Sequence, residues 1–564
     1  MTAPRPAGAG PSPTAALALG AGAPLALALL ALWARPLLPI DETRYLAVAW
    51  DMWAHGQWLV PHLNGAPYAD KPPLLFWLFH LGWALFGVND WWPRLVPALF
   101  AAGSTWLTAR LAVLLWPPGG AGVPPGVDSR RLAAVAAVVL AACLLWTLYA
   151  TLVMFDMVLA FFAVLGVYAL ARCWRRGRAR DWALLGAAIG LGVLAKGPVI
   201  LLHVLPAALL APWWSAGRLG PTRARWYLGV TGAVALGAII ALAWALPAAQ
   251  AGGPAYAHAI FWGQTADRVV DSFAHRRPWW WYLPLLPVFL FPWLLWPPLW
   301  RALRHWPREQ SRGDTGLRFC LAWLAPALLA FSLVSGKQPH YLLPLVPGFA
   351  LLAARLLIAG PLGARNERGR WYDGLALAGV AIALGTGLLV VLERAPALAA
   401  WPDWVARASP AWGVLLIVAG AALLLLARLP RRRQLWAVAP LSGLLVVVLY
   451  AGLMHPLYAR YDLRPAAREI ADLQRQGAPV ALVGAYYGEY QFLGRLRRAL
   501  TVLHPERAGA WARNHPRGFV LVYYAQGLPH GAPAPVFSQP YRTRTLAIWP
   551  AGTLAARPRL LGTN

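Results

Sequence analysis

The chain has 564 residues, of which 59% are hydrophobic and 13% are charged, and its mean hydropathy is +0.52. A soluble domain is about 45–50% apolar and about 25% charged, so this composition excludes an ordinary soluble protein. The apolar residues fall in uninterrupted blocks of about 17–23 residues, long enough to cross a bilayer as helices. The pattern predicts an α-helical polytopic membrane protein rather than a membrane barrel, whose strands alternate apolar and polar residues.

The net charge of +29 comes from 50 Lys and Arg against 21 Asp and Glu. Such a balance is also typical of nucleic-acid-binding proteins. We attribute it instead to cytoplasmic loops, which collect Arg and Lys in membrane proteins, and we expect no nucleic-acid partner. The 33 tryptophans fit rings at the two membrane interfaces. The three cysteines lie in or beside apolar blocks, so no disulfide framework is expected.

The first apolar block is expected to remain as a helix, because no small-residue cleavage site precedes the polar loop that follows it. We predict about thirteen spans in a transmembrane domain of residues 1–454. The predicted spans cover residues 15–38, 94–116, 132–150, 156–173, 182–195, 198–214, 227–248, 280–300, 318–335, 341–358, 373–393, 411–428 and 435–454.

Clusters of arginine follow every even-numbered span, which predicts that these loops are cytoplasmic. The opposite face then holds the outer loop 41–93, Asp156, the loops 250–279 and 336–340, and the C-terminal segment. The clusters contain Arg130 and Arg131; Arg172, Arg175, Arg176, Arg178 and Arg180; Arg218, Arg223 and Arg225; Arg301, Arg304, Arg308, Arg312 and Arg318; Arg365, Arg368 and Arg370; and Arg428, Arg431, Arg432 and Arg433.

Residues 455–564 have a mixed polar and apolar composition and predict a small α/β domain of common size. Helical spacing is found in 464–476 and near 487–497, and short strands are predicted at 479–483, 518–524 and 545–549. The segment contains no phosphate-loop motif and no metal-spaced motif, and no organic cofactor is expected.

The outer loop begins with two carboxylates, Asp41 and Glu42, and ends with Asp70 and Lys71 before a Pro-Pro pair. Two acids at a helix end are also typical of a charged interfacial cap. Ionisable residues at membrane depth more often indicate function, and a carboxylate there can deprotonate or orient an acceptor hydroxyl. Lys71 is either an interfacial lysine that reaches the headgroups or a fixed cation for a phosphate.

Asp156 lies among apolar residues and is predicted either to cap the fourth span or to carry chemistry; the two roles are compatible. Lys196 lies in an apolar region and needs a partner, for which a phosphate or an acid is plausible. The span it follows is short and is expected to be tilted or to end in a turn at 196–198.

The later outer loops add more charged residues. The 250–279 loop contains His258, Arg268 and His275, and its run of aromatic residues at 279–282 is typical of an interfacial belt. Lys337 and Tyr341 lie in another outer loop, which on its own is an ordinary connector. Acids, cations and aromatic residues on one membrane face together suit a lipid-linked phosphate substrate.

Several spaced blocks resemble one branch of the GT-C membrane glycosyltransferases. That branch contains the lipid A aminoarabinose transferases and their relatives among the protein O-mannosyltransferases. The similar blocks are DETRY, WLVPHLNGAPYADKPPLLFWL, FGVND, RLVPALF, FDMVLAF, LGVLAKGPV, HRRPWWWYLPLLPVFLFPW and SGKQPHYLLPLVP, which occur in this order over residues 35–360.

The resemblance implies a GT-C fold with an outer C-terminal α/β domain, in a bacterial inner membrane with the active site facing the periplasm. It implies transfer of a sugar from a polyprenyl (undecaprenyl) phosphate donor to lipid A or another envelope acceptor. Transfer to protein Ser or Thr is the alternative within enzymes. A lipid-linked sugar transporter is the alternative of another class, disfavoured because the chain shows no internal repeat.

The resemblance also implies roles for single residues. Asp41 and Asp156 match the catalytic carboxylates, and Lys71 matches a lysine that contacts the donor phosphate. A divalent metal ion is associated with the positions of Asp70, where the family often has Glu, and of a later histidine, either His258 or His275. The further residues expected to bind substrate are Glu42, Tyr45, Lys196, Arg268, Lys337 and Tyr341.

Overall fold

The computed structural model describes residues 12–119, 128–217, 219, 222–263, 276–305, 313–359, 369–394 and 405–561. It divides into two compact units. The first, which we call the helical unit, contains residues 1–31, 94–246 and 258–452. The second, which we call the mixed unit, contains residues 32–93, 247–257 and 453–564.

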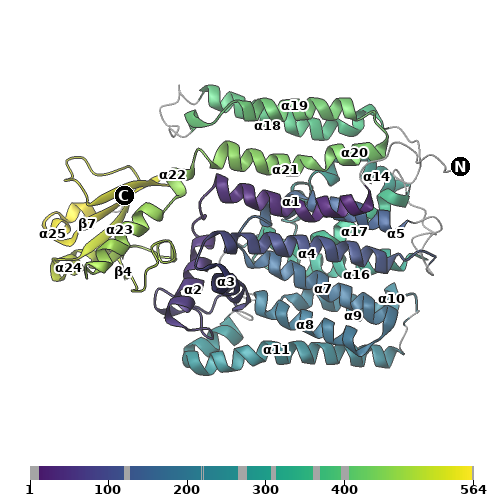
Figure 1. Cartoon of the computed structure of the whole chain (residues 1–564), viewed down its shortest axis with the longest axis horizontal. Coiled ribbons are helices and arrows are strands. Elements are labelled where there is room, and N and C mark those ends of the chain that lie inside the picture. Colours follow the sequence, from purple (N-terminus) through teal and green to yellow (C-terminus); the bar gives the residue numbers. More distant parts are fainter. Residues whose placement is uncertain are drawn as a thin grey trace. The chain divides into compact units, whose positions relative to one another are not determined.

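The helical unit is built from apolar helices that run side by side (Figure 1). Eight of the described helices are long and apolar enough to cross a membrane, which confirms a polytopic membrane protein. The main helices are α1 (Pro13–Ala34), α4 (Trp91–Leu115), α5 (Ser129–Ala141), α6 (Leu144–Tyr149), α7 (Phe155–Arg176), α8 (Ala179–Lys196), α9 (Ile200–Leu209), α10 (Ala211–Trp214), α11 (Arg223–His258), α16 (Thr315–Leu333), α17 (Val346–Ala359), α18 (Leu375–Arg394), α19 (Ala411–Leu426), α20 (Arg431–Val438) and α21 (Pro440–Val447).

The predicted span 280–300 is not one helix. The structure replaces it with short pieces, because five prolines interrupt the segment and each removes a backbone donor that a regular helix needs. The pieces are η2 (Leu283–Leu285), α13 (Leu286–Phe289), η3 (Trp293–Leu295) and α14 (Pro297–Arg304). The shorter regular turns elsewhere are η1 (Ala259–Gly263), η4 (Pro339–Leu345), η5 (Trp371–Gly374), η7 (Val405–Arg407) and η8 (Val448–Met454).

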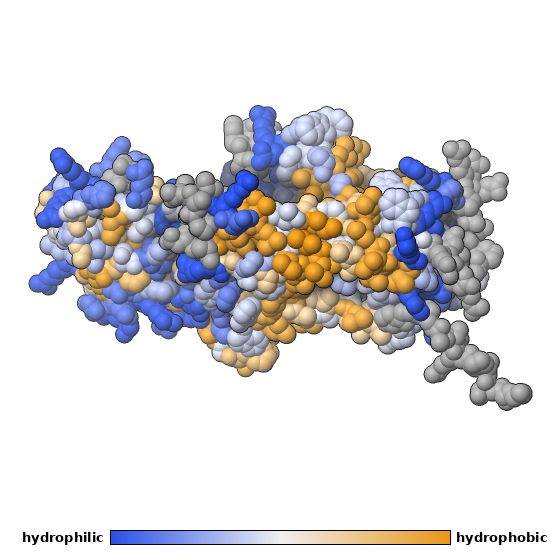
Figure 2. All heavy atoms as spheres, turned by 90° about the horizontal axis from the view of Figure 1, so that it is seen from above, coloured by the Kyte–Doolittle hydropathy of each residue, from blue (hydrophilic) through white to orange (hydrophobic). Residues whose placement is uncertain are grey.

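The surface of the helical unit is rich in hydrophobic side chains (Figure 2). Leu228, Ile239 and Leu425 are each more than 60% exposed. An apolar surface of this kind is stable only against lipid or another apolar surface. Helices α5, α14 and α20, which carry arginines of the predicted cytoplasmic clusters, lie at the same end of this unit (Figure 1).

The buried Asp314 of the helical unit forms an ion pair with additional hydrogen bonds. Asp314 precedes α16, where its side chain accepts from the backbone N–H of Leu317 at 2.9 Å. The same carboxylate accepts from Trp116 Nε1 at 2.7 Å and from Arg355 Nε at 2.8 Å, and both acid and arginine are fully buried. The acid therefore joins three segments of the unit.

The mixed unit combines the outer loop with the C-terminal domain. The outer loop folds into α2 (Asp41–His55), a two-stranded hairpin of β1 (His62–Leu63) and β2 (Ala66–Pro67), and α3 (Leu74–Phe86). The C-terminal domain contains helices α22 (Tyr458–Tyr461), α23 (Arg464–Arg475), α24 (Pro505–Asn514), α25 (Ala551–Ala556) and η9 (Pro558–Leu561), and strands β3 (Val480–Val483), β4 (Thr501–Leu503), β5 (Phe519–Tyr524), β6 (Phe537–Tyr541) and β7 (Arg544–Pro550).

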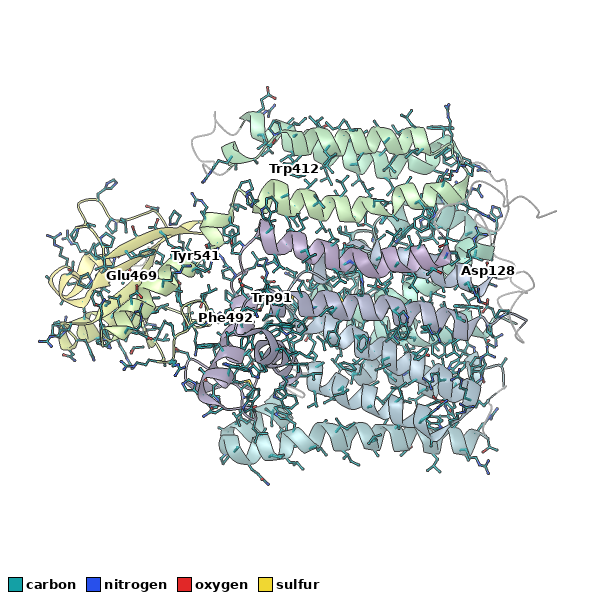
Figure 3. The ribbon with its side chains drawn as sticks, viewed as in Figure 1. Trp91, Asp128, Trp412, Glu469, Phe492 and Tyr541 are labelled. Atoms are coloured by element: carbon teal, nitrogen blue, oxygen red, sulfur yellow. The ribbon has the colours of Figure 1, made fainter. Side chains whose placement is uncertain are left out.

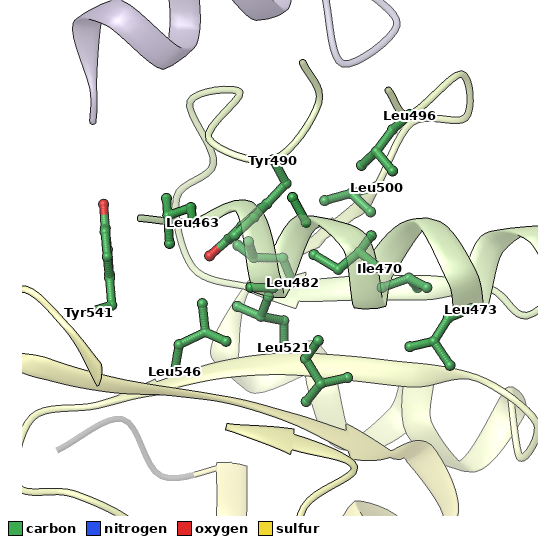
Figure 4. Close-up of a cluster of buried hydrophobic side chains, with 14 residues drawn as sticks. Leu463, Ile470, Leu473, Leu482, Tyr490, Leu496, Leu500, Leu521, Tyr541 and Leu546 are labelled. Atoms are coloured by element: carbon green, nitrogen blue, oxygen red, sulfur yellow. The ribbon is translucent and has the colours of Figure 1, made fainter. Parts of the chain in front are cut away.

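The five strands form one mixed sheet in the order β4-β3-β5-β7-β6, parallel from β4 to β5 and antiparallel from β5 to β6. Alternate residues of β3 face opposite sides, as the pleat requires. Val480 and Leu482 join α23 and the 490–500 segment in one core (Figure 4), whereas Ala481 and Val483 join α24 and α25 in another.

The C-terminal domain is fastened to the outer loop by buried hydrogen bonds. The Gln491 side chain donates to Asp51 Oδ2 of α2 at 2.6 Å and accepts from the backbone N–H of Asn64 at 3.1 Å. Trp50 Nε1 donates to the carbonyl of Leu496 at 2.9 Å. Phe492, labelled in Figure 3, stacks on Trp83 of α3 with ring centroids 5.5 Å apart. These contacts fix α2, the helix that begins with Asp41, to the sheet domain.

The predicted helix 464–476 and the three predicted strands of this domain are confirmed as α23, β3, β5 and β7. The predicted helical stretch 487–497 is wrong, because the structure places turns there. Gly488 and Arg495 have φ angles of 85° and 52°, in the left-handed region that a right-handed helix excludes. Docking on α2 requires this shape: a Cβ at Gly488 would lie 2.8 Å from that of Ala47.

We predict that Asp314→Asn destabilises the protein by about 3–5 kcal/mol, because it leaves the Arg355 guanidinium buried without its counter-charge. Thermal unfolding of the full chain in detergent measures the change. Asp472→Asn is the matched control: its pair with Arg475 is exposed, and its loss costs about 0–1 kcal/mol. Equal shifts in melting temperature for the two variants would contradict the role given to Asp314.

Candidate functional site

The two acids of the DETRY motif both lie in the first turn of α2, but their environments differ. Glu42 is buried and accepts two hydrogen bonds from Arg35, Nη1 to Oε2 at 2.5 Å and Nη2 to Oε1 at 2.9 Å. Its Oε2 also accepts from the backbone N–H of Leu38 at 2.7 Å. These contacts make Glu42 a support for the turn before α2, and its predicted role in binding substrate stays a prediction.

Asp41 has the opposite environment. Its side chain is 52% exposed and pairs with Arg44, one helical turn later. The Tyr45 hydroxyl lies 3.5 Å from the same carboxylate oxygen, and the rest of Tyr45 is buried. An accessible carboxylate can accept a proton from a bound hydroxyl. Arg44 was not singled out from the sequence, although its spacing of three residues from Asp41 on a helix predicts the contact.

Asp70 and Lys71 lie between the β1–β2 hairpin and α3, where Pro72 and Pro73 precede the helix. Asp70 is exposed and Lys71 is partly buried. Their predicted roles, a metal ligand and a phosphate contact, stay predictions.

A second group of candidate residues lies in the helical unit. Asp156 is buried in the first turn of α7, and its carboxylate forms an ion pair with Lys196, the last residue of α8. The Lys196 ammonium also lies 5.0 Å from the ring centroid of Tyr341 in η4. The structure therefore brings together Asp156, Lys196 and Tyr341. The expected acid partner of Lys196 is confirmed, but the cap of α7 is Met154 and not Asp156.

Lys337 is buried, and its ammonium donates to the backbone carbonyls of Arg277 at 3.0 Å and of Val334. Burial lowers the pKa of its ammonium. The Tyr282 hydroxyl donates to the carbonyl of Gln338 at 3.1 Å, beside this lysine. These bonds make Lys337 a brace for the loop that leads to Tyr341, while the predicted phosphate contact of Lys337 stays a prediction.

Two predicted site residues, Arg268 and His275, lie outside the described residues, and His258 is exposed at the end of α11. In the part of the chain that the structure describes, no three His, Cys, Asp or Glu side chains form a group able to hold a metal ion. Asp70 alone does not make a metal site, since such sites need several ligands. The divalent ion stays a prediction, and no step proposed below depends on it.

Comparison with known proteins gives a consistent result. A family model described as dolichyl-phosphate-mannose-protein mannosyltransferase matches residues 70–244. The chain is 31% identical to undecaprenyl phosphate-α-4-amino-4-deoxy-L-arabinose arabinosyl transferase 1 of Pseudomonas fluorescens, over 84% of this chain and 82% of the relative. It is also 31% identical to transferase 2 of Pseudomonas fluorescens strain Pf0-1, over 65% of this chain and 64% of that relative's length.

Among solved structures, the crystal structure of ArnT from Cupriavidus metallidurans bound to undecaprenyl phosphate is similar over 95% of this chain and 98% of its own. The TM-score is 0.66 and the sequence identity 20%, so this likeness shows a shared fold. An archaeal oligosaccharyltransferase, AglB from Archaeoglobus fulgidus, is similar with a TM-score of 0.50 and 12% identity.

We predict that Asp156 and Lys196 are energetically coupled, because the loss of either side chain leaves the other as an unpaired charge in an apolar environment. A double-mutant cycle of Asp156→Asn, Lys196→Met and the double variant measures the coupling by thermal unfolding. The expected interaction energy is about 0.5–3 kcal/mol. The exposed pair of Asp472 and Arg475, treated in the same way, is the control. Strictly additive losses at Asp156 and Lys196 would contradict the pairing.

Proposed function

Because this chain belongs to the family of undecaprenyl phosphate-α-4-amino-4-deoxy-L-arabinose arabinosyl transferases, which are membrane glycosyltransferases, we propose that it transfers 4-amino-4-deoxy-L-arabinose. The donor is the undecaprenyl-phosphate-linked sugar, and the acceptor is an envelope lipid such as lipid A. The observation that carries the proposal is the 31% identity over 84% of the chain. The exposed Asp41 carboxylate at the start of α2 supports the proposal, because the neighbouring acid, Glu42, is already paired with Arg35.

In the proposed reaction, an acceptor oxygen attacks the anomeric carbon of the donor sugar. The bond from this carbon to the phosphate oxygen breaks, and its electron pair leaves with undecaprenyl phosphate. Asp41 takes the proton of the acceptor, and Arg44 holds the Asp41 carboxylate in place. Lys71 and Arg268 stabilise the negative charge on the leaving phosphate.

Asp156 is proposed as the second catalytic carboxylate. Its carboxylate forms an ion pair with Lys196 among apolar residues, and the Tyr341 ring lies against the lysine. Tyr341 is proposed to offer aromatic surface to substrate, and the Lys337 brace supports the loop that carries Tyr341. Tyr45 is buried and places its hydroxyl beside Asp41. A lysine can release a carboxylate more readily than an arginine, whose fork holds both oxygens.

The proposed location is a bacterial inner membrane, crossed about thirteen times, with Asp41 and the C-terminal domain on the periplasmic side. In Figure 1, α5, α14 and α20 lie at the same end of the helical unit, which supports a cytoplasmic location for the arginines of all three helices. A cysteine-labelling map with a membrane-impermeant reagent tests this topology: a cysteine in place of the exposed Glu506 of the C-terminal domain should react from the periplasm, and labelling only after lysis would contradict it.

A second candidate function is transfer to a protein hydroxyl, which the match of residues 70–244 to the mannosyltransferase model favours. Purified protein, assayed with a panel of undecaprenyl-phosphate sugars against lipid A and a Ser/Thr-rich peptide, separates the candidates. We expect aminoarabinose on lipid A. Product on the peptide alone would favour the second candidate, and sugar-lipid transport without product would favour a transporter.

We predict that Asp41→Asn lowers the rate of transfer by about 10²–10⁴-fold, the usual contribution of a general base. The melting temperature should stay near that of the natural protein, because the side chain is half exposed. Initial rates with saturating donor and acceptor measure the effect. Glu469→Gln, in α23, is the matched loss of a carboxylate and should keep full activity. A normal rate for Asp41→Asn would refute the assignment.

A further inference from the structure

The C-terminal domain carries a strong positive charge that the proposed topology does not explain. Residues 453–564 contain fourteen arginines, no lysine and five acidic residues. Cytoplasmic loops collect basic residues for reasons of membrane insertion, but this domain is placed on the other side of the membrane. A basic surface there is explained by attraction to an anionic partner.

One turn brings this charge next to the outer loop. It has the sequence Arg-Leu-Arg-Arg, and we call residues 495–498 the arginine turn. Leu496 is buried and its carbonyl accepts from Trp50 of α2. Just after the turn, Asn64 of the outer loop makes two hydrogen bonds with the backbone of Leu500, at 2.8 and 2.9 Å. The backbone is therefore fixed on both sides of Arg497 and Arg498.

The side chains of the arginine turn have two kinds of environment. The Arg495 guanidinium lies 3.9 Å from the ring centroid of Phe492 and 5.4 Å from that of Trp50. Arg495 also has a φ of 52°, an uncommon conformation for a residue with a side chain. Such conformations persist where the surroundings hold them, and they cluster at functional sites.

Arg497 and Arg498 point into solvent. Both are exposed, and the structure records no ion pair for either of them among the residues it describes. By contrast, two arginines of this domain each pair with an acid: Arg475 with Asp472, and Arg464 with Asp462. The fixed backbone and the missing acid leave two neighbouring guanidinium groups available to an anion from outside the chain.

We propose that the arginine turn binds a phosphate group of the acceptor lipid and presents that lipid to the outer loop. The inference rests on the proposed function, in which a phosphorylated envelope lipid such as lipid A is the acceptor. Guanidinium groups bind phosphate through paired N–H donors, with a defined orientation that a lysine does not impose. A turn attached directly to α2 would fix the acceptor relative to the helix that begins with Asp41.

The same chemistry would attract the phosphate of any anionic membrane lipid. We commit to the acceptor lipid, because the turn lies on the face of the domain that contacts α2 and the β1–β2 hairpin, where Ala499 is 3.6 Å from a Cβ built at Gly65. A surface that only attracted bulk lipid would have no need of contact with the helix that carries Asp41.

The test compares Arg497→Gln/Arg498→Gln with the natural chain in detergent, using lipid A with two phosphates, lipid A with one phosphate, and phosphatidylglycerol as probes. We expect the Kd for lipid A with two phosphates to rise about tenfold, equivalent to about 1.4 kcal/mol. The Kd values for lipid A with one phosphate and for phosphatidylglycerol should change much less. In the transfer assay, the KM for the acceptor should rise while the KM for the donor stays the same.

Arg513→Gln/Arg517→Gln is the matched control. It removes the same charge from exposed arginines at the α24 side of the sheet, opposite the face that the 490–500 segment covers. This control should bind all three probes as the natural chain does. Arg497→Lys/Arg498→Lys keeps the charge and should recover only part of the affinity, because the paired donors are lost.

Unchanged affinity in Arg497→Gln/Arg498→Gln would overturn the proposal, and so would equal losses in the control. A loss of equal size for phosphatidylglycerol would show a general anionic-lipid surface and would also overturn it. If the natural chain binds lipid A but transfers no sugar, the proposed function fails while the binding measurement still decides the role of the turn.

Discussion

The attachment of the C-terminal domain to α2 is the constraint on which the rest of the mixed unit depends. The Gln491 side chain joins Asp51 on α2 to the backbone of Asn64. The side chains of Gln491 and Asp51 are both buried, so water cannot take the place of either partner. Loss of such a donor lowers the stability of the folded protein, because the buried carboxylate is left without a hydrogen-bond partner. The contact thereby couples residues more than 400 positions apart, and it fixes the helix that begins with Asp41 and carries Arg44 near its start.

The acidic side chains of this protein differ in their burial and in their partners. The buried acids Glu42, Asp314 and Asp373 each pair with an arginine, and Arg35 contacts both oxygens of Glu42. The two acids proposed to act in catalysis differ from them. Asp41 is half exposed, and Asp156 pairs with a lysine, whose single ammonium restrains a carboxylate less.

The sequence predicted the membrane class, the α23 helix and three strands of the sheet, because these depend on local hydrophobic patterns. It also predicted that Lys196, a lysine among apolar residues, has a phosphate or an acid as its partner, and the structure shows the acid Asp156. It did not predict the broken segment 280–300, where proline chemistry outweighs hydropathy. The turns at 487–497 and the contact of Gln491 with Asp51 were missed because they depend on a distant segment, and no local pattern records such a contact.

Hydrogen exchange of the α2 backbone in the full chain tests the central claim, that docking of the C-terminal domain holds α2 in place. Gln491→Leu removes the bridge, and Gln476→Leu, an exposed glutamine at the end of α23, is the control. The account predicts faster exchange across α2 in Gln491→Leu alone, with a lower rate of sugar transfer. Identical exchange of α2 in the natural chain and both variants would contradict it.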